Sequence, residues 1–193
     1  MVADDATAVA DIGQGNEETA ITAELMEAIA PQDATDSASP SIDDAVKIGC
    51  ATRTDDAVTR ILTLDLGLTN GLRRYRRGKI VAVFSGTYQQ TGAVVAVNLL
   101  NYFANDNHRL GARVFTNLDK RSFDLSVQNA SIIFANNSGT TSWTLQRRYT
   151  RTADFGTHTI LDDAYSITGL LTNTNRLRSH LLKNLLLVMP ATS

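Results

Sequence analysis

The heptapeptide Arg73-Arg74-Tyr75-Arg76-Arg77-Gly78-Lys79 marks the point where an acidic sequence gives way to a basic one. It runs directly into Ile80-Val81-Ala82-Val83-Phe84, whose β-branched and aromatic content is typical of a strand. Upstream, residues 62–68 alternate strictly and predict a half-buried strand, and Asn70-Gly71 predicts a hairpin turn. We therefore expect the heptapeptide to begin the second strand of a hairpin, or to form a short loop that leads into it.

Charge divides the chain at this heptapeptide. Residues 1–72 hold 14 Asp and Glu against 3 Lys and Arg, a net charge of −11. Residues 73–193 hold 6 acidic and 15 basic residues, a net charge of +9, so the overall value of −2 hides a strong asymmetry. Such asymmetry predicts that one half meets an oppositely charged partner. That partner is nucleic acid, the acidic half of the same chain, or a neighbouring subunit.

Length and composition narrow the class of protein. The 193 residues suffice for one domain with a core and an arm, and 43% hydrophobic with 20% charged content is ordinary for a globular protein. No apolar run is long enough to span a bilayer, and no secretory signal is visible, so we expect no membrane partner. Cys50 is the single cysteine, which excludes an intrachain disulfide.

The first 40 residues are expected to form an acidic arm and linker, with a β-rich body over residues 41–193. Met1 to Gly15 is small and acidic, which indicates a mobile segment. Asn16 then suits a helix N-cap, and an apolar stripe at helical spacing predicts a helix that ends at Pro31. This helix packs either on its own domain or on a neighbouring subunit. Residues 32–40 have the composition of a linker.

Two Asp-Asp-Ala-Val groups follow, after Ser41-Ile42 and after Arg53-Thr54. Paired carboxylates raise the ideas of metal binding and acid–base chemistry. A hydroxyl residue shortly before two aspartates is more typical of a helix start, and we favour that interpretation.

The body reads as many short strands separated by Asn-, Gly- and Ser-rich turns, which indicates a mainly β fold. One strand is expected to place Trp143, Leu145, Arg147 and Tyr149 on a single face. We expect an antiparallel β-sandwich, in the form of a jelly roll, over about residues 60–193. Near the end, leucines at helical spacing predict a helix over residues 173–189, with a buried strand over residues 185–189 as the rival.

No set of residues predicts catalysis, a cofactor or a metal. The histidines, His108, His158 and His180, lack metal-ligand spacing, and no phosphate-binding glycine motif or nucleophile elbow occurs. We therefore expect a protein that is not an enzyme. A small β body rich in Thr, Asn and Ser, with a long arm, is typical of virion building blocks.

The favoured hypothesis is a self-assembling structural subunit of a viral or phage particle, either capsid or tail-type. It would assemble in the host cytoplasm into a homo-oligomer, through charge-complementary arm and body surfaces. The alternative is a nucleic-acid-binding module that uses arginine and tyrosine clusters. The same residues are candidates for either contact: Arg73, Arg74, Tyr75, Arg76, Arg77, Lys79, Arg147, Arg148, Tyr149 and Arg151.

Overall fold

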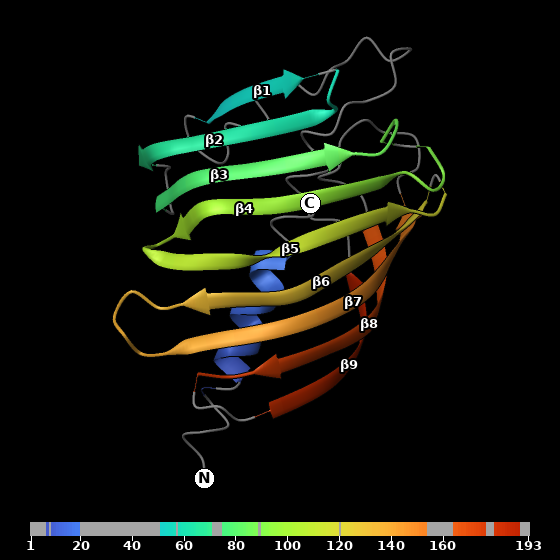
Figure 1. Cartoon of the computed structure of the whole chain (residues 1–193). Coiled ribbons are helices and arrows are strands. Elements are labelled where there is room, and N and C mark those ends of the chain that lie inside the picture. Colours follow the sequence, from blue (N-terminus) through green and yellow to red (C-terminus); the bar gives the residue numbers. More distant parts are fainter. Residues whose placement is uncertain are drawn as a thin grey trace.

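The computed structural model shows one antiparallel sheet of nine strands that lie in chain order, β1 to β9 (Figure 1). It describes residue 7 and residues 9–19, 51–56, 58–70, 75–88, 90–119, 121–153, 164–176 and 180–189. The strands are β1 Thr52–Asp56, β2 Ile61–Asn70, β3 Tyr75–Phe84, β4 Val94–Ala104, β5 Asn107–Asn117, β6 Ser122–Ile133, β7 Thr140–Ala153, β8 Ala164–Thr174 and β9 His180–Met189. Residue 7 and residues 9–19 are helical and are called the arm helix below.

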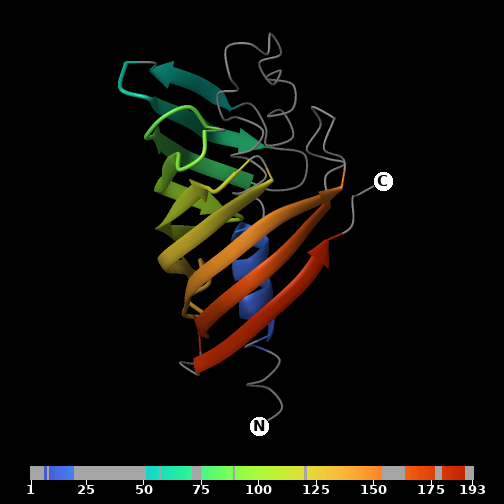
Figure 2. The same cartoon turned by 90° about the vertical axis from the view of Figure 1, so that its right-hand side faces the viewer.

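The sheet curves around the arm helix, which lies on its concave side (Figures 1 and 2). The strand register explains the curvature. Each pairing from β2–β3 to β6–β7 contains a shift, and residues with positive φ lie at these shifts: Gly67, Gly78, Asn101, Gly111 and Asn129. A bulge bends its strand and increases the local twist, so bulges on consecutive strands coil the whole sheet.

Alternation along the strands separates a buried concave face from an exposed convex face. Leu62, Leu64 and Leu66 of β2 are at most 1% exposed, as the alternation of residues 62–68 predicts. The predicted face of β7 is also confirmed, because its four members are all buried: Trp143, Leu145, Arg147 and Tyr149. The core is therefore the layer between the concave face and the arm helix.

The mainly β, antiparallel prediction is confirmed, whereas the sandwich or jelly-roll arrangement is not. The described strands form one sheet in chain order, and a jelly roll needs connections that cross between two sheets. The hairpin after β2 is present, but Asn70 pairs with Tyr75, so Asn70 belongs to the strand and the predicted two-residue turn at Asn70-Gly71 is wrong. A two-residue turn occurs instead at Asn105-Asp106, where both φ angles are positive.

Some of the helix predictions are wrong, and others lie outside the described residues. The end of the chain forms β9 rather than a helix, because its backbone pairs with β8 over the whole length from Tyr165↔Met189 to Thr174↔His180. Thr54-Asp55-Asp56 lies in β1 and does not start a helix, since it pairs with β2. The Asp43-Asp44 group, the apolar stripe of residues 21–29 and the linker of residues 32–40 lie outside the described residues.

The arm helix occupies a segment that composition alone predicted to be mobile. Asn16 lies inside this helix rather than at its N-cap. The reason is tertiary, because the sheet supplies partners for residues that would otherwise be poor helix stabilisers. Gly15 packs on Trp143, where an added Cβ would lie 3.2 Å from ring atom Cδ2, and Ile12 joins the core. Contacts with the concave face therefore outweigh the weak local propensity.

Candidate binding surface: the arginine-lined concave face

The concave face of the sheet carries a set of buried arginines. They come from three alternate strands of the sheet, none of which pairs with another: Arg76 of β3, Arg109 and Arg113 of β5, and Arg147 of β7. All four are at most 7% exposed, which is rare for a charged side chain. The arm helix lies over this face and presents Asp11, Asn16 and Glu18 to the body.

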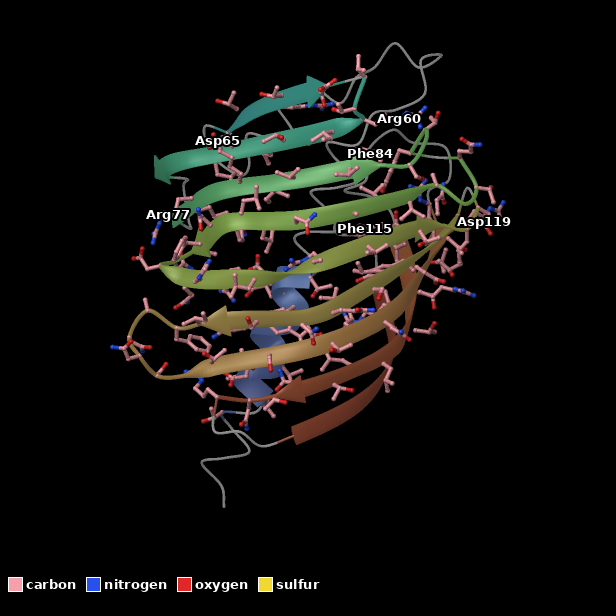
Figure 3. The ribbon with its side chains drawn as sticks, viewed as in Figure 1. Arg60, Asp65, Arg77, Phe84, Phe115 and Asp119 are labelled. Carbon is pink, nitrogen blue, oxygen red and sulfur yellow. The ribbon has the colours of Figure 1, made fainter. Side chains whose placement is uncertain are left out.

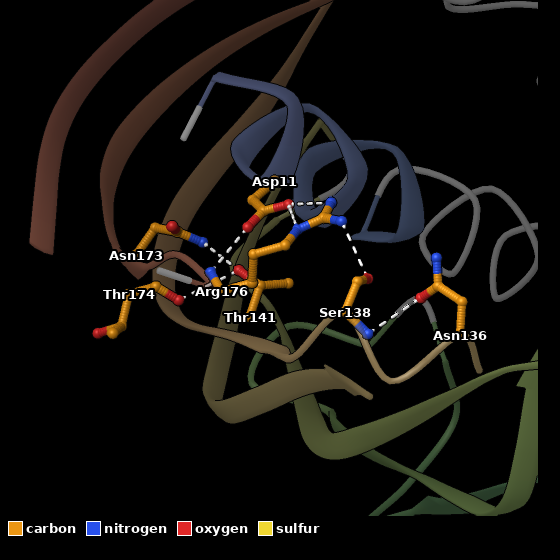
Figure 4. Close-up of polar contacts among 7 residues, drawn as sticks. All are labelled: Asp11, Asn136, Ser138, Thr141, Asn173, Thr174 and Arg176. Carbon is orange, nitrogen blue, oxygen red and sulfur yellow. Dashed lines mark hydrogen bonds and ion pairs between the residues drawn. The ribbon is translucent and has the colours of Figure 1, made fainter. Parts of the chain in front are cut away.

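One end of the helix is fixed by a buried ion pair. The Asp11 carboxylate, 0% exposed, accepts hydrogen bonds from Nη2, Nε and the backbone N–H of Arg176, at 2.6, 3.0 and 2.9 Å. Arg176 also donates to Ser138 Oγ and stacks 3.9 Å from the centroid of Phe134. Figure 4 shows this contact between the helix and the segments that follow β6 and β8.

Next to it, a polar network closes the end of β7 and β8. The Asn173 amide donates to Thr141 Oγ1 at 3.2 Å, and that hydroxyl donates to the Thr174 carbonyl at 3.1 Å (Figure 4). Ser138 is itself held by a backbone hydrogen bond to Asn136 Oδ1. The Arg176 contact is therefore anchored on a rigid hydrogen-bonded frame.

The middle and far parts of the helix face the arginines. Arg147 Nη2 donates to Asn16 Oδ1 at 2.5 Å. Glu18, buried, lies 3.7 Å from Arg109 through its Oε2 atom. Burial lowers the pKa of the Arg109 and Arg113 guanidiniums, and the Glu18 carboxylate partly offsets this effect.

Tyr102 of β4 completes the cluster. Its hydroxyl, in a side chain 1% exposed, accepts a 2.6 Å hydrogen bond from Arg76 Nη1. Burial is the main cause that raises the pKa of Tyr102, so the hydroxyl stays neutral and serves as a polar partner of the arginine.

The two candidate arginine–tyrosine clusters are separated in the sheet, and only one described arginine of each, Arg76 and Arg147, lies on the arginine-lined concave face. They lie on β3 and β7, four strands apart, which is about 19 Å at the usual strand spacing. Arg73 and Arg74 lie outside the described residues, and Tyr75 begins β3. Strand alternation splits the remaining members, so Arg76 and Arg147 face the helix while Arg77 and Arg148 do not.

The exposed members of the clusters are paired with carboxylates. Arg77 Nη1 contacts Asp106 Oδ1 at 2.6 Å and lies over the Phe103 ring, and Lys79 contacts Asp65 at 2.9 Å. Figure 3 shows Arg77 at the opposite end of the sheet from Arg60 and Asp119. A basic side chain whose charge is already neutralised by a carboxylate contributes less to the affinity for a phosphate backbone.

The second cluster behaves in the same way. Arg148 makes a bidentate contact with Asp124 at 2.7 and 2.8 Å. Tyr149 is buried and stacks on Phe123, with ring centroids 4.7 Å apart, so it is not available for stacking on a base. Arg151 Nη2 reaches the Tyr165 hydroxyl at 3.4 Å.

Three arginines of this site were not predicted from the sequence: Arg109, Arg113 and Arg176. Of these, Arg109 and Arg176 contact the arm helix. A signal for the first two exists, because Arg109 and Arg113 are four residues apart on one strand and therefore share a face. Another signal is Gly169, which pairs with Arg147 across β7 and β8. A Cβ there would overlap the Gln146 carbonyl oxygen and lie 2.9 Å from Arg147 Cγ, so the close approach of the two strands beside Arg147 requires a glycine.

No protein-family model matches the chain, and no curated protein or solved structure matches it. Among the described residues, no group of three or more His, Cys, Asp or Glu is placed to hold a metal ion. No helix in the described part of the chain has the length and apolar content needed to cross a membrane. The most distinctive feature of the described residues is the concave face, with its buried arginines and the arm helix that contacts them.

Proposed function

We propose that this protein is a self-assembling structural subunit, and that the particle it builds is a viral coat or tail-type structure. In this proposal the acidic arm of one copy docks on the arginine-lined concave face of another. The observation that carries it is the contact between the arm helix and that face, through Asp11–Arg176, Asn16–Arg147 and Glu18–Arg109. The fit of an acidic arm to a basic body is what arm exchange between subunits requires.

The length of chain between helix and sheet supports exchange. Residues 20–50 separate the arm helix from the first described residue before β1. These 31 residues can reach at most about 100 Å when fully extended. A neighbouring body lies well within that limit. Since the exchanged helix would make the same contacts as the helix of its own chain, exchange has a low energetic cost and is favoured by high local concentration.

The edges of the sheet offer a second assembly contact. Within the described sheet, β1 and β9 each pair with a neighbour on one side only. An edge strand presents backbone N–H and C=O groups to another chain. Seven of the ten residues of β9 are Leu, Val or Met, a composition that favours pairing over solvation.

A sandwich would follow if two copies stack their convex faces. Four apolar side chains of that face are between 38% and 49% exposed: Val83, Leu100, Ile133 and Leu170. Covering them in an assembly would remove apolar surface from water. In this arrangement the predicted β-sandwich would consist of two sheets that come from two different subunits.

Nucleic-acid binding is the second candidate and stays a prediction. The specific observation behind it is the arginine content of the concave face, which would become accessible if the arm helix left it. Arg77, Lys79 and Arg148 already pair with carboxylates. For this reason we favour self-assembly over nucleic-acid binding.

Negative-stain microscopy of the purified full-length chain tests the proposal, with a variant lacking residues 1–40 beside it. We expect closed particles, rings or tubes from the full chain, and smaller species from the deletion variant. Absorbance at 260 nm in the same preparations reports bound nucleic acid. Small single particles from the full chain at every concentration would contradict self-assembly, and nucleic acid bound at low salt without particles would favour the alternative.

A further inference from the structure

Buried positive charge exceeds buried negative charge between the arm helix and the sheet. Four guanidiniums of the described residues are at most 7% exposed: Arg76, Arg109, Arg113 and Arg147. The buried carboxylates among the described residues are Asp11 and Glu18, and Asp11 is engaged by Arg176. An arginine remains protonated in a protein, so burial cannot neutralise it. An uncompensated buried charge is strongly unfavourable, and the described residues of this layer supply fewer carboxylates than guanidiniums, which favours a further anion there.

Two of these arginines also carry buried N–H groups without acceptors. Arg109 Nε and Nη1, and Arg113 Nε and Nη2, have no hydrogen-bond partner. Arg113 is 0% exposed, and its Nη1 donates to the Gly111 carbonyl at 3.2 Å. The distance of 3.7 Å from Arg109 Nε to Glu18 is too long for a hydrogen bond. Buried donors are almost always satisfied, so four such groups in one cluster indicate a ligand that accepts several hydrogen bonds.

The local backbone leaves this part of the face free of a competing side chain. Arg109 and Arg113 lie on β5 with Gly111 between them. Gly111 has a φ of 113° at the bulge between β5 and β6, and a Cβ there would lie 2.5 Å from Ala130 Cα. A larger residue is therefore excluded, and the two arginines are separated by a position without a side chain.

We propose that Arg109 and Arg113 bind a small tetrahedral oxyanion, of the phosphate or sulfate class, between β5 and the arm helix. Such an ion supplies both negative charge and several acceptor atoms, whereas a water molecule supplies an acceptor atom without negative charge. The planar guanidinium fork matches its oxygen atoms. The side chains that carry these donors are at most 7% exposed, so a nucleic-acid backbone cannot reach them and the proposed ligand is a small ion. The bound ion stabilises the docked helix, because it binds a site that exists only when the helix is in place. This inference does not depend on self-assembly.

Thermal unfolding of the full-length chain tests the site, with inorganic phosphate as the probe and sodium chloride at matched ionic strength and pH as the reference. At ten times its dissociation constant, phosphate should raise Tm by about 3–6 °C. Isothermal titration calorimetry should show one phosphate bound per chain. Absence of a phosphate-specific rise in Tm together with absence of a calorimetric signal would overturn the proposal.

Matched variants separate this site from general salt effects. Arg113→Met should abolish the phosphate increment in Tm, whatever the Tm of the variant itself. Arg148→Met should keep the full increment, because Arg148 is exposed and pairs with Asp124. If Arg113→Met does not fold, Arg109→Lys keeps the charge but loses the fork, and should weaken phosphate binding about tenfold. An equal increment in all variants would show a bulk effect of phosphate on stability and would refute the site.

Discussion

Removal of the Asp11 carboxylate is the sharpest perturbation of the contact between arm helix and body. Asp11→Ala deletes three hydrogen bonds from Arg176, at 2.6, 2.9 and 3.0 Å, and leaves its guanidinium without a carboxylate. Breaking a buried ion pair from one side costs about 3–5 kcal/mol. The Arg176 side chain is 19% exposed and keeps Ser138 and Phe134 as neighbours, so we expect the lower limit, about 3 kcal/mol.

Urea unfolding of the full-length chain, followed by circular dichroism and by Trp143 fluorescence, measures this loss. Asp124→Ala is the control, since it removes an equally short bidentate contact with Arg148 from the exposed face. The unfolding midpoint of the control should fall much less than that of Asp11→Ala, because solvent already screens exposed pairs. A cost below about 0.5 kcal/mol for Asp11→Ala, or an equal loss in both variants, would refute the reasoning.

Two further predictions concern the packing of the arm helix on Trp143 and the exposed ion pair between Asp124 and Arg148. Gly15→Leu should push the arm helix away from Trp143, destabilise the protein and shift the emission of this single tryptophan to longer wavelength, since an added Cβ already lies 3.2 Å from the ring. Gly13→Leu, where nothing lies within 4 Å of an added Cβ, should leave the emission unchanged; an equal shift in both would contradict the packing. The hydrogen bond from Arg148 lowers the pKa of Asp124 below its usual value. The Asp124 contact therefore stabilises the fold above about pH 4, and the stability difference between wild type and Asp124→Asn should vanish as the pH falls through the lowered pKa. Urea midpoints between pH 6 and 2.5 measure this, and a difference that persists at the acid limit would contradict it.

Short-range patterns predict the strands of this protein well, because alternation is a property of neighbouring residues. Residues 62–68 and the face from Trp143 to Tyr149 are examples, and both are buried as their spacing requires. The C-terminal leucines do not show such an unambiguous pattern. A run with leucine at many positions fits a helical and a strand period alike, and pairing with β8 decides between them. A sequence does not show that pairing directly.

Long-range contacts explain why the site was predicted only in part. Arg76 and Arg147 were found because they belong to conspicuous basic clusters. Arg176 was missed because its partner, Asp11, is 165 residues away in the sequence. The start of the arm helix was predicted too late, at Asn16, for the same reason, since contacts with the sheet help to stabilise the helical residues before it.

The mass of the full-length protein in solution, measured by light scattering after size exclusion, tests self-assembly most directly. The measurement is made at about 0.05 M and about 1 M sodium chloride, because salt screens the long-range attraction between the acidic arm of one copy and the basic body of another, although it weakens buried ion pairs much less. At low salt we predict a mass that is a multiple of 20.9 kDa, falling towards 20.9 kDa at high salt. A mass of 20.9 kDa at both salt concentrations would contradict the account.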